Sequence, residues 1–184
     1  MKKIERIVFC SGKKIVLRPL IKRDIPQLLV WFNDPEVNQY LTGYLPLYEK
    51  EEEEWFERLH RDKQTEIVLA IETKKGNFIG NIGLHRIRWT DGFATLGITI
   101  GNKHYWGQNY GSDAIMTILK YAFNTLNLRK ICLSVLEFNQ RAYRCYYKCG
   151  FREEGRKKKQ YFKNGRYVDE IQMAIFKRDF KILN

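Results

Sequence analysis

The stretch GNKHYWGQNYGS, residues 101–112, decides the fold of this 184-residue chain. A strand-like run, Ala94–Ile100, leads into it, and a strongly helical run, Asp113–Leu126, leads out of it. Between them lies a polar turn of small residues that ends where a helix begins. Such a turn presents unpaired backbone N–H groups and the positive end of the helix dipole to whatever lies in front of it. The natural occupant is a phosphate group, so the turn predicts a phosphorylated ligand.

Strand patterns on both sides of this turn predict a mixed sheet. The connection from Ala94–Ile100 to the strand-like run Lys130–Leu136 passes through a helix, so these two strands should be parallel. The turn then lies at the C-terminal end of the first of them, where sheets of this kind usually bind ligands. The remaining strand patterns form a meander and a hairpin, which predicts mostly antiparallel pairing. They are Lys14–Arg18, Glu66–Glu72 and Phe78–Leu84, and then Lys158–Lys163 and Arg166–Phe176 around the turn Asn164-Gly165.

Helical patterns occupy much of the rest of the chain. Asp24 can cap a helix that runs through Phe32, and a short second piece is expected at Glu36–Leu41. Further helices are expected at Glu49–Leu59, which is rich in glutamate, and at Gln140–Cys149, just before Gly150. The elements together predict one α+β (mixed α/β) domain over residues 1–184. Its central sheet should be mixed and mostly antiparallel, with helices on both faces and one parallel strand pair.

The positive charge of the chain is concentrated in the half that holds the turn. The net charge is +12, of which residues 95–184 carry +10 and residues 1–94 carry +2. Such asymmetry suits a polyanionic ligand, which a nucleotide cofactor or a nucleic acid can supply. No apolar run approaches the roughly 20 residues of a membrane span. The four cysteines form no CxxC pair, and Cys145 and Cys149 lack two further metal ligands. We therefore expect a cytoplasmic protein without a membrane partner or a metal.

Four sequence motifs occur together and cover nearly the whole chain. The turn WGQNYG, residues 106–111, has the form Arg/Gln-x-x-Gly-x-Gly/Ala in part, and residues 139–151 have the form Asn-x-x-Ala-x-x-x-Tyr-x-x-x-Gly-Phe. The others are FKNGRYVD, residues 162–169, and LRPL, residues 17–20, with WFNDPEV, residues 31–37. In this order they resemble the GNAT superfamily of acetyl-CoA-dependent N-acetyltransferases, in the branch that contains ribosomal-protein N-terminal acetyltransferases and spermidine acetyltransferases. The resemblance implies a single GNAT-like domain.

The resemblance also implies how acetyl-CoA is held. The pantetheine arm adds to the edge of the strand before the loop like an extra β-strand, and the loop binds the pyrophosphate. Trp106 has packing as its alternative role, and Asn139 can cap the next helix instead of contacting the cofactor. The implied cofactor-binding residues are Ile98, Thr99, Ile100, Trp106, Gly107, Gln108, Asn109, Tyr110, Gly111, Ser112, Asn139, Ala142 and Tyr146.

Tyr146 is implied as the catalytic residue that protonates the leaving thiolate. A phenol with a pKa of about 10 stays protonated at neutral pH and can donate to a thiolate whose pKa is about 8.5. Core packing is the alternative role for a tyrosine on a helix. Tyr143 and Tyr147 are close neighbours that share one helical face with each other.

Two residues depart from the family pattern. Asn109 stands where the family usually has Gly, and Asn tolerates left-handed backbone angles better than most residues. Thr95 stands where many relatives carry a Glu that is a candidate general base, so the base is left unassigned. The residues expected near the substrate are Asp34, Glu36, His85 and Asp169, each with a structural role as its alternative.

The sequence thus predicts an N-acetyltransferase in which a primary amine attacks acetyl-CoA directly in a ternary complex. The acceptor is a small molecule or a protein N-terminus, and a polyamine is the alternative. The acidic run Glu49–Glu54 favours a polyamine, whereas the overall positive charge disfavours it. A non-catalytic acetyl-CoA-binding protein is a rival because of Thr95 and Asn109. A nucleic-acid-binding module that uses Arg156–Lys159 leaves the loop motif unexplained, and a homo-oligomer is left open.

Overall fold

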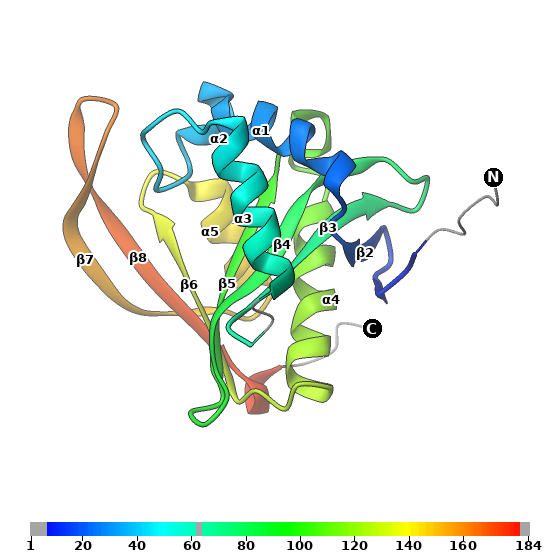
Figure 1. Ribbon diagram of the computed structural model, residues 1–184. Helices are drawn as coiled ribbons and strands as arrows, with labels where there is room; N and C mark the ends of the chain where they lie inside the picture. Colours follow the sequence, from blue (N-terminus) through cyan, green and yellow to red (C-terminus); the bar gives the residue numbers. More distant parts are fainter. Residues whose placement is uncertain (1–6, 62–63, 181–184) are drawn as a thin grey trace.

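Eight strands form one mixed sheet in the computed structural model, which describes residues 7–61 and 64–180 (Figure 1). The strand order is β1-β2-β3-β4-β5-β6-β8-β7, and β5 with β6 is the one parallel pair within these residues. The mixed, mostly antiparallel sheet and its parallel pair are therefore confirmed. The strands are β1 (Cys10–Ser11), β2 (Ile15–Pro19), β3 (Glu66–Thr73), β4 (Phe78–Arg88), β5 (Phe93–Ile100), β6 (Lys130–Leu136), β7 (Arg152–Lys163) and β8 (Arg166–Phe176).

Helices cover both faces of the sheet, as the sequence predicts. In β3, Leu69 and Ile71 belong to the buried cluster beneath α4, because successive strand residues point to opposite faces. Val68 and Ala70 face the other way and pack with α1 and α3. Figure 1 shows α3 and α4 on opposite sides of the sheet. The helices are α1 (Ile25–Asn33), α2 (Pro35–Asn38), α3 (Glu49–Arg61), α4 (Tyr110–Asn124) and α5 (Gln140–Lys148).

Asp24 does not cap α1 with its side chain, which corrects the sequence prediction. Its two carboxylate oxygens accept hydrogen bonds from Arg18 Nη1 at 2.6 Å and Nη2 at 2.8 Å. The same guanidinium donates through Nε to Glu72 on β3 at 2.5 Å, and all three side chains are buried. Two reasons explain the missing cap. A buried cation requires anionic partners, and Asp24 is one of them. In addition, Pro26 in the first turn of α1 has no N–H group that a capping side chain could accept from.

Several element boundaries also differ from the sequence prediction, and α2 ends at Asn38, three residues before Leu41. Helix α4 begins at Tyr110, three residues before Asp113. Strand β4 continues past Leu84 to Arg88. Strand β7 begins at Arg152, six residues before Lys158, because a lysine-rich, solvent-exposed segment pairs with β8 at the sheet edge. Charged side chains are common on edge strands, where they hinder pairing with another chain.

Asp113, in the first turn of α4, ties that helix to the start of β2. Its carboxylate accepts backbone hydrogen bonds from Lys13 at 3.0 Å, Lys14 at 2.6 Å and Ile15 at 3.0 Å. The chain passes so close that a Cβ atom on Gly12 would lie 2.6 Å from Asp113 Oδ2, so only glycine fits there without a shift. The contact fixes the position of the N-terminal end of α4, which carries the loop of residues 101–112.

Glu52 on α3 is a buried carboxyl group whose Oε1 has no hydrogen-bond partner in the described part of the structure. Its residue is 4 % exposed. Burial raises the pKa of Glu52 from its ordinary value of 4.5 to about 7. The folded protein therefore holds a proton there at pH values where the unfolded chain has lost it.

Replacing Glu52 with Gln should remove a loss of stability that accompanies rising pH. The free energy of unfolding should fall between pH 4.5 and about 7, since the folded state binds more protons in that window. Gln stays neutral, so Glu52→Gln should gain roughly 2–3 kcal/mol over the wild type at about pH 8 and little at about pH 4. Urea denaturation at both pH values measures the difference. Glu54→Gln, at an exposed position of the same helix, is the control, and an equal effect of both variants contradicts the prediction.

Candidate active site

Strands β5 and β6 part after three residue pairs. Phe93–Thr95 pairs with Lys130–Cys132, but β5 continues to Ile100 and β6 to Leu136. On their outer sides, β5 stays paired with β4 and β6 with β8. The two facing edges therefore diverge without another described strand between them. A cleft of about 580 Å³ opens at this point, which is the size of a small-molecule site.

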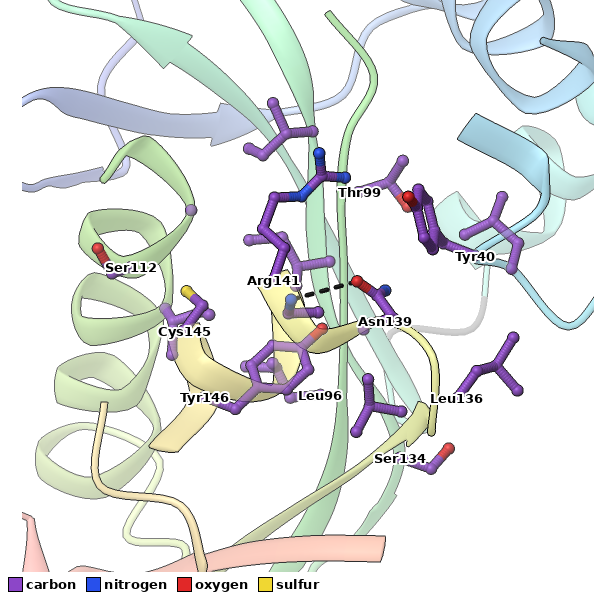
Figure 2. A pocket seen from close by; sticks show the side chains of 18 of the residues that line it. Tyr40, Leu96, Thr99, Ser112, Ser134, Leu136, Asn139, Arg141, Cys145 and Tyr146 are labelled. Atoms are coloured by element: carbon purple, nitrogen blue, oxygen red, sulfur yellow. Dashed lines mark hydrogen bonds between the residues drawn. The ribbon is translucent and has the colours of Figure 1, made fainter. Parts of the chain in front are cut away.

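Side chains converge on this cleft from several elements (Figure 2). One part of its lining comes from the loop after β5 and from α5, and it carries the positive charge. Another part comes from the segment after α2, from β4 and β5, from the end of β6 and from Glu170 within β8. The lining includes Tyr40, Leu41, Thr42, Asn81, His85, Thr95, Gly97, Thr99, Ser134, Leu136, Asn139, Arg141, Arg144, Cys145, Tyr146, Lys148 and Glu170.

The loop before α4 turns through two left-handed residues. Gly107 has a φ of +74° and Asn109 a φ of +66°. The expectation that Asn109 accepts a left-handed conformation in place of glycine is confirmed. Gly107, Asn109, Gly111 and Ser112 line the cleft, and the Ser112 hydroxyl donates to the Asn109 carbonyl at 3.0 Å. The loop thus brings the N-terminal end of a 15-residue helix to the cleft.

Three cations on α5 face this loop, and the sequence reasoning missed them. Arg141, Arg144 and Lys148 all line the cleft. Lys148 Nζ donates to Asn109 Oδ1 at 3.2 Å, and the Arg141 guanidinium lies 3.7 Å from the centre of the Trp106 ring. The spacing of three and four residues along one helix was the available signal, because it places the three side chains on one face.

The other loop residues divide between lining and support. Trp106 lines the cleft and also packs, since its Nε1 donates to the Ile100 carbonyl at 2.6 Å. Gln108 and Tyr110 are not among the residues that line it. Gln108 Nε2 donates to the His104 carbonyl at 2.5 Å, and the Tyr110 ring packs edge-on against Tyr105 with centroids 5.0 Å apart.

Tyr146 is the one tyrosine of α5, a helix described in full, that lines the cleft. Tyr143 packs against the core, and Tyr147 is exposed beneath the Arg152 guanidinium. Burial, reinforced by the neighbouring Cys145 and Cys149, raises the pKa of Tyr146 well above its ordinary value. The phenol therefore stays protonated at neutral pH and can donate a hydrogen bond to negative charge that develops beside it.

Asn139 and Ala142 meet at the start of α5. Asn139 caps the helix, because its Oδ1 accepts from the Ala142 N–H at 3.2 Å (Figure 2). Both residues line the cleft as well, so capping and a contact with a ligand are compatible. Ile98, Thr99 and Ile100, on the free edge of β5, also line it.

Of the four residues expected near the substrate, only His85 lines the cleft. Asp34 caps α2 by accepting from the Glu36 N–H at 2.9 Å, and Lys103 Nζ lies 2.8 Å from both the Asp34 and the Glu36 carboxylates. Asp169 accepts from the Lys159 N–H at 2.8 Å and pairs with Lys158 at 3.1 Å. These three carboxylates already have structural partners, so we do not place them in the site.

Glu170 is a cleft residue that the sequence reasoning missed. It is buried on β8 opposite Leu136, and its carboxylate lies 3.0 Å from Lys157 Nζ. Two absences hold for the residues described here: they form no cluster of three or more side chains that could hold a metal ion, and they include no helix long and apolar enough to span a membrane.

Comparison with known proteins finds one matching family model and several relatives. The family model for the acetyltransferase (GNAT) domain matches residues 14–152. The chain is 31% identical over 150 residues to the spermidine N(1)-acetyltransferase of Vibrio cholerae, covering 82% of this chain and 80% of that protein. A putative ribosomal N-acetyltransferase of Bacillus subtilis is 26% identical over 106 residues, 58% of this chain and 57% of that protein.

A solved structure is similar over nearly its whole length. It is the spermidine N-acetyltransferase from Vibrio cholerae in complex with CoA and spermine, at 30% identity and a TM-score of 0.84. The match covers 90% of this chain and 96% of that one.

Two substitutions of Asn109 should separate backbone geometry from side-chain contact. Asn109→Gly and Asn109→Ala both remove the contact with Lys148, but only glycine adopts a φ of +66° without strain. We expect Asn109→Gly to bind acetyl-CoA about as tightly as the wild type. Asn109→Ala should bind roughly fivefold or more weakly, since alanine in this conformation costs on the order of 1 kcal/mol. Calorimetric titration with acetyl-CoA measures both, and equal affinities of the two variants contradict the expectation.

Proposed function

This chain belongs to the GNAT acetyltransferase family and is an acetyl-CoA-dependent N-acetyltransferase, and we propose that its acceptor is a primary amine of a small molecule. The observation that carries the proposal is the cleft between β5 and β6, with a free strand edge, the loop at the N-terminal end of α4 and a buried tyrosine around one space. The amine nitrogen attacks the thioester carbon, the carbon–sulfur bond breaks, and the sulfur leaves as a thiolate that takes up a proton.

The donor half of the cleft suits acetyl-CoA. The backbone edge at Ile98–Ile100 offers hydrogen-bonding groups to the pantetheine amides and the thioester. The loop from Trp106 to Ser112 offers N–H groups to the pyrophosphate, and Arg141, Arg144 and Lys148 supply positive charge beside it. Asn139 and Ala142 lie between these two parts, near the start of α5.

Tyr146 is the proton donor in this proposal. Its ring lies in the wall of the cleft, and burial keeps its hydroxyl protonated. Charge develops on the sulfur as the carbon–sulfur bond breaks, and the phenolic hydroxyl donates its proton there. Because the thiolate is a weaker base than the phenolate, the phenolate then recovers a proton from the amide nitrogen by way of water. Tyr143 and Tyr147 do not line the cleft, which supports the assignment to Tyr146.

A cluster of rings around Arg141 favours a small acceptor. The Arg141 guanidinium lies between Trp106, at 3.7 Å, and Tyr40, at 5.2 Å from the ring centre. Tyr40 also contacts Phe138, with ring centroids 6.0 Å apart. These contacts join the segment after α2 to the start of α5 and to Trp106. Because Tyr40, Trp106 and Arg141 also line the cleft, their contacts leave less room for the N-terminus of a folded protein than for a small amine.

A polyamine is the second candidate. One relative of known structure, which matches 90% of this chain, is a spermidine N-acetyltransferase in complex with CoA and spermine. Against it stands the charge of the cleft, since Glu170 is the single carboxylate among the described lining residues and already pairs with Lys157. A substrate with several ammonium groups favours several free carboxylates.

We further propose one domain over residues 1–184 and a cytoplasmic location. One sheet contains every described strand, which supports a single domain. The four cysteines are free thiols, which suits a reducing compartment.

A panel of acceptors tests the proposed substrate class. Thiol release from acetyl-CoA is measured with small monoamines such as amino sugars, with spermidine and with a ribosomal protein that has a free N-terminus. We expect the highest kcat/KM for a small monoamine. If spermidine gives the highest kcat/KM, the second candidate is supported instead. If no amine in the panel releases thiol from acetyl-CoA, the proposed function is contradicted.

Tyr146→Phe should lower kcat at least tenfold, by rough estimate, and leave the affinity for acetyl-CoA nearly unchanged. The change removes the acidic proton but keeps the ring that packs 6.1 Å from Phe151. Tyr147→Phe, at an exposed position one residue further along the helix, is the matched control and should retain full turnover. Unchanged turnover in Tyr146→Phe contradicts the assigned role.

A further inference from the structure

We propose that His85, oriented by Glu66, is the general base that removes the proton from the acceptor ammonium group. The inference rests on the proposed function, because it assigns the proton that the amine must lose. Tyr146 supplies a proton to the sulfur, and a separate group must accept one from nitrogen. A primary alkylamine has a pKa of about 10, so it is charged at neutral pH and cannot attack before it is deprotonated.

The His85 ring is held by a carboxylate on the neighbouring strand. Glu66 on β3 is the direct antiparallel partner of His85 on β4, and its Oε1 contacts His85 Nδ1. The His85 side chain is 34% exposed and lines the cleft. A carboxylate on one ring nitrogen fixes the ring orientation and the tautomer, which leaves Nε2 as the nitrogen that accepts a proton.

Two glycines place that nitrogen on the floor of the cleft. A Cβ atom on Gly83 would lie 2.9 Å from His85 Nε2, and one on Gly97 would lie 3.1 Å from it. The imidazole therefore lies over two positions without side chains. Thr95 is the last residue of β5 that pairs with β6, and Gly97 lies two residues after it. His85 Nε2 is thus next to the point where the strands part and where the thioester is expected.

The same position explains a departure from the family pattern. Thr95 stands where many relatives carry a glutamate as candidate base, and a hydroxyl does not serve that role at neutral pH. His85 is the direct cross-strand partner of Thr95 in the antiparallel pair of β4 and β5. The two side chains therefore share one face of the sheet, so the basic group lies one strand away from its usual position.

The proton transfers balance with these groups. The ammonium proton passes to His85 Nε2, the freed lone pair attacks the thioester carbon, and the carbon–sulfur bond breaks. The thiolate takes the proton of Tyr146, and the nitrogen, now bonded to the acetyl carbon, gives its second proton by way of water to the Tyr146 phenolate. His85 then releases its proton to solvent. Glu66 stabilises the imidazolium while it exists. The other charged groups that line the described cleft are Glu170, which pairs with Lys157, and Arg141, Arg144 and Lys148 on α5. Arg86 is the next residue after His85 on β4. Thr95 and Gly97 from β5 carry no charge.

His85→Gln tests the proposal with two acceptors of different basicity. With an alkylamine at about pH 7, we expect kcat/KM to fall roughly 100-fold, and to recover as the pH approaches about 10 and the amine deprotonates itself. With a weakly basic acceptor such as an arylamine, which is neutral at pH 7, the loss should be less than tenfold, by the same reasoning. Stabilisation by acetyl-CoA in a thermal melt should not change. His104→Gln, an exposed histidine outside the cleft, is the matched control.

Glu66→Gln tests the positioning role of the carboxylate. It should lower kcat for the alkylamine by a smaller factor, roughly tenfold, and move the acidic limb of the pH–rate profile. A residue with a purely structural role would not move that limb. His85→Ala, which opens space over Gly83 and Gly97, should regain activity when imidazole is added to the assay.

The outcomes separate this inference from the proposed function. A wild type that releases no thiol with any small amine overturns the proposed function and the base with it. An active wild type with an unaffected His85→Gln variant overturns the base alone. The base is also overturned by a combination of two results: His85→Gln loses equal activity with both acceptors at every pH, and imidazole does not restore the activity of His85→Ala.

Discussion

The parting of β5 from β6 is the constraint on which the rest of the site depends. Three parallel pairs hold the strands at one end, and their outer neighbours β4 and β8 hold them apart beyond it. Backbone groups left without a strand partner inside a sheet carry a free-energy cost unless water or a ligand satisfies them. A cofactor with amide groups in an extended arm can do so, and its phosphates then reach the N-terminal end of α4. The position of that helix is fixed in turn by Asp113, which holds the start of β2 through three backbone N–H groups.

Local patterns predicted the sheet and the loop, because each depends on residues close in sequence. The helix between β5 and β6 required a parallel pair, and Asn109 tolerated the left-handed turn that the loop needs. Interactions over long separations were not predictable in this way. Asp24 accepts hydrogen bonds from the buried Arg18 and does not cap helix α1. Arg18 is buried because β2 pairs with β3, a contact between segments far apart in sequence. The charged edge strand β7 carries no apolar periodicity, so its first half reads as a loop.

The chemistry of the acceptor half depends on strand register, which explains why it was the hardest part to predict. Glu66 and His85 are 19 residues apart and become partners only when β3 and β4 align. Glu170 enters the cleft wall because it pairs with Leu136, at the end of β6. Asp169, one residue away, faces the bulge in β7 instead. A shift of one residue in this ladder would exchange the two carboxylates, since neighbouring strand residues face opposite sides. The donor half is thus defined by a motif, and the acceptor half by the tertiary structure.

Amide hydrogen exchange with and without acetyl-CoA tests the central claim most directly. If the cofactor adds to the open edge of β5, amide protons within residues 96–100 should exchange fast in the free protein and slowly in the complex. Residues 107–112 should gain protection as well, because the loop binds the pyrophosphate. Amides of β3 and β7, away from the gap, should change little. Protection confined to other segments, with residues 96–100 unchanged at saturating acetyl-CoA, would contradict this account of the site.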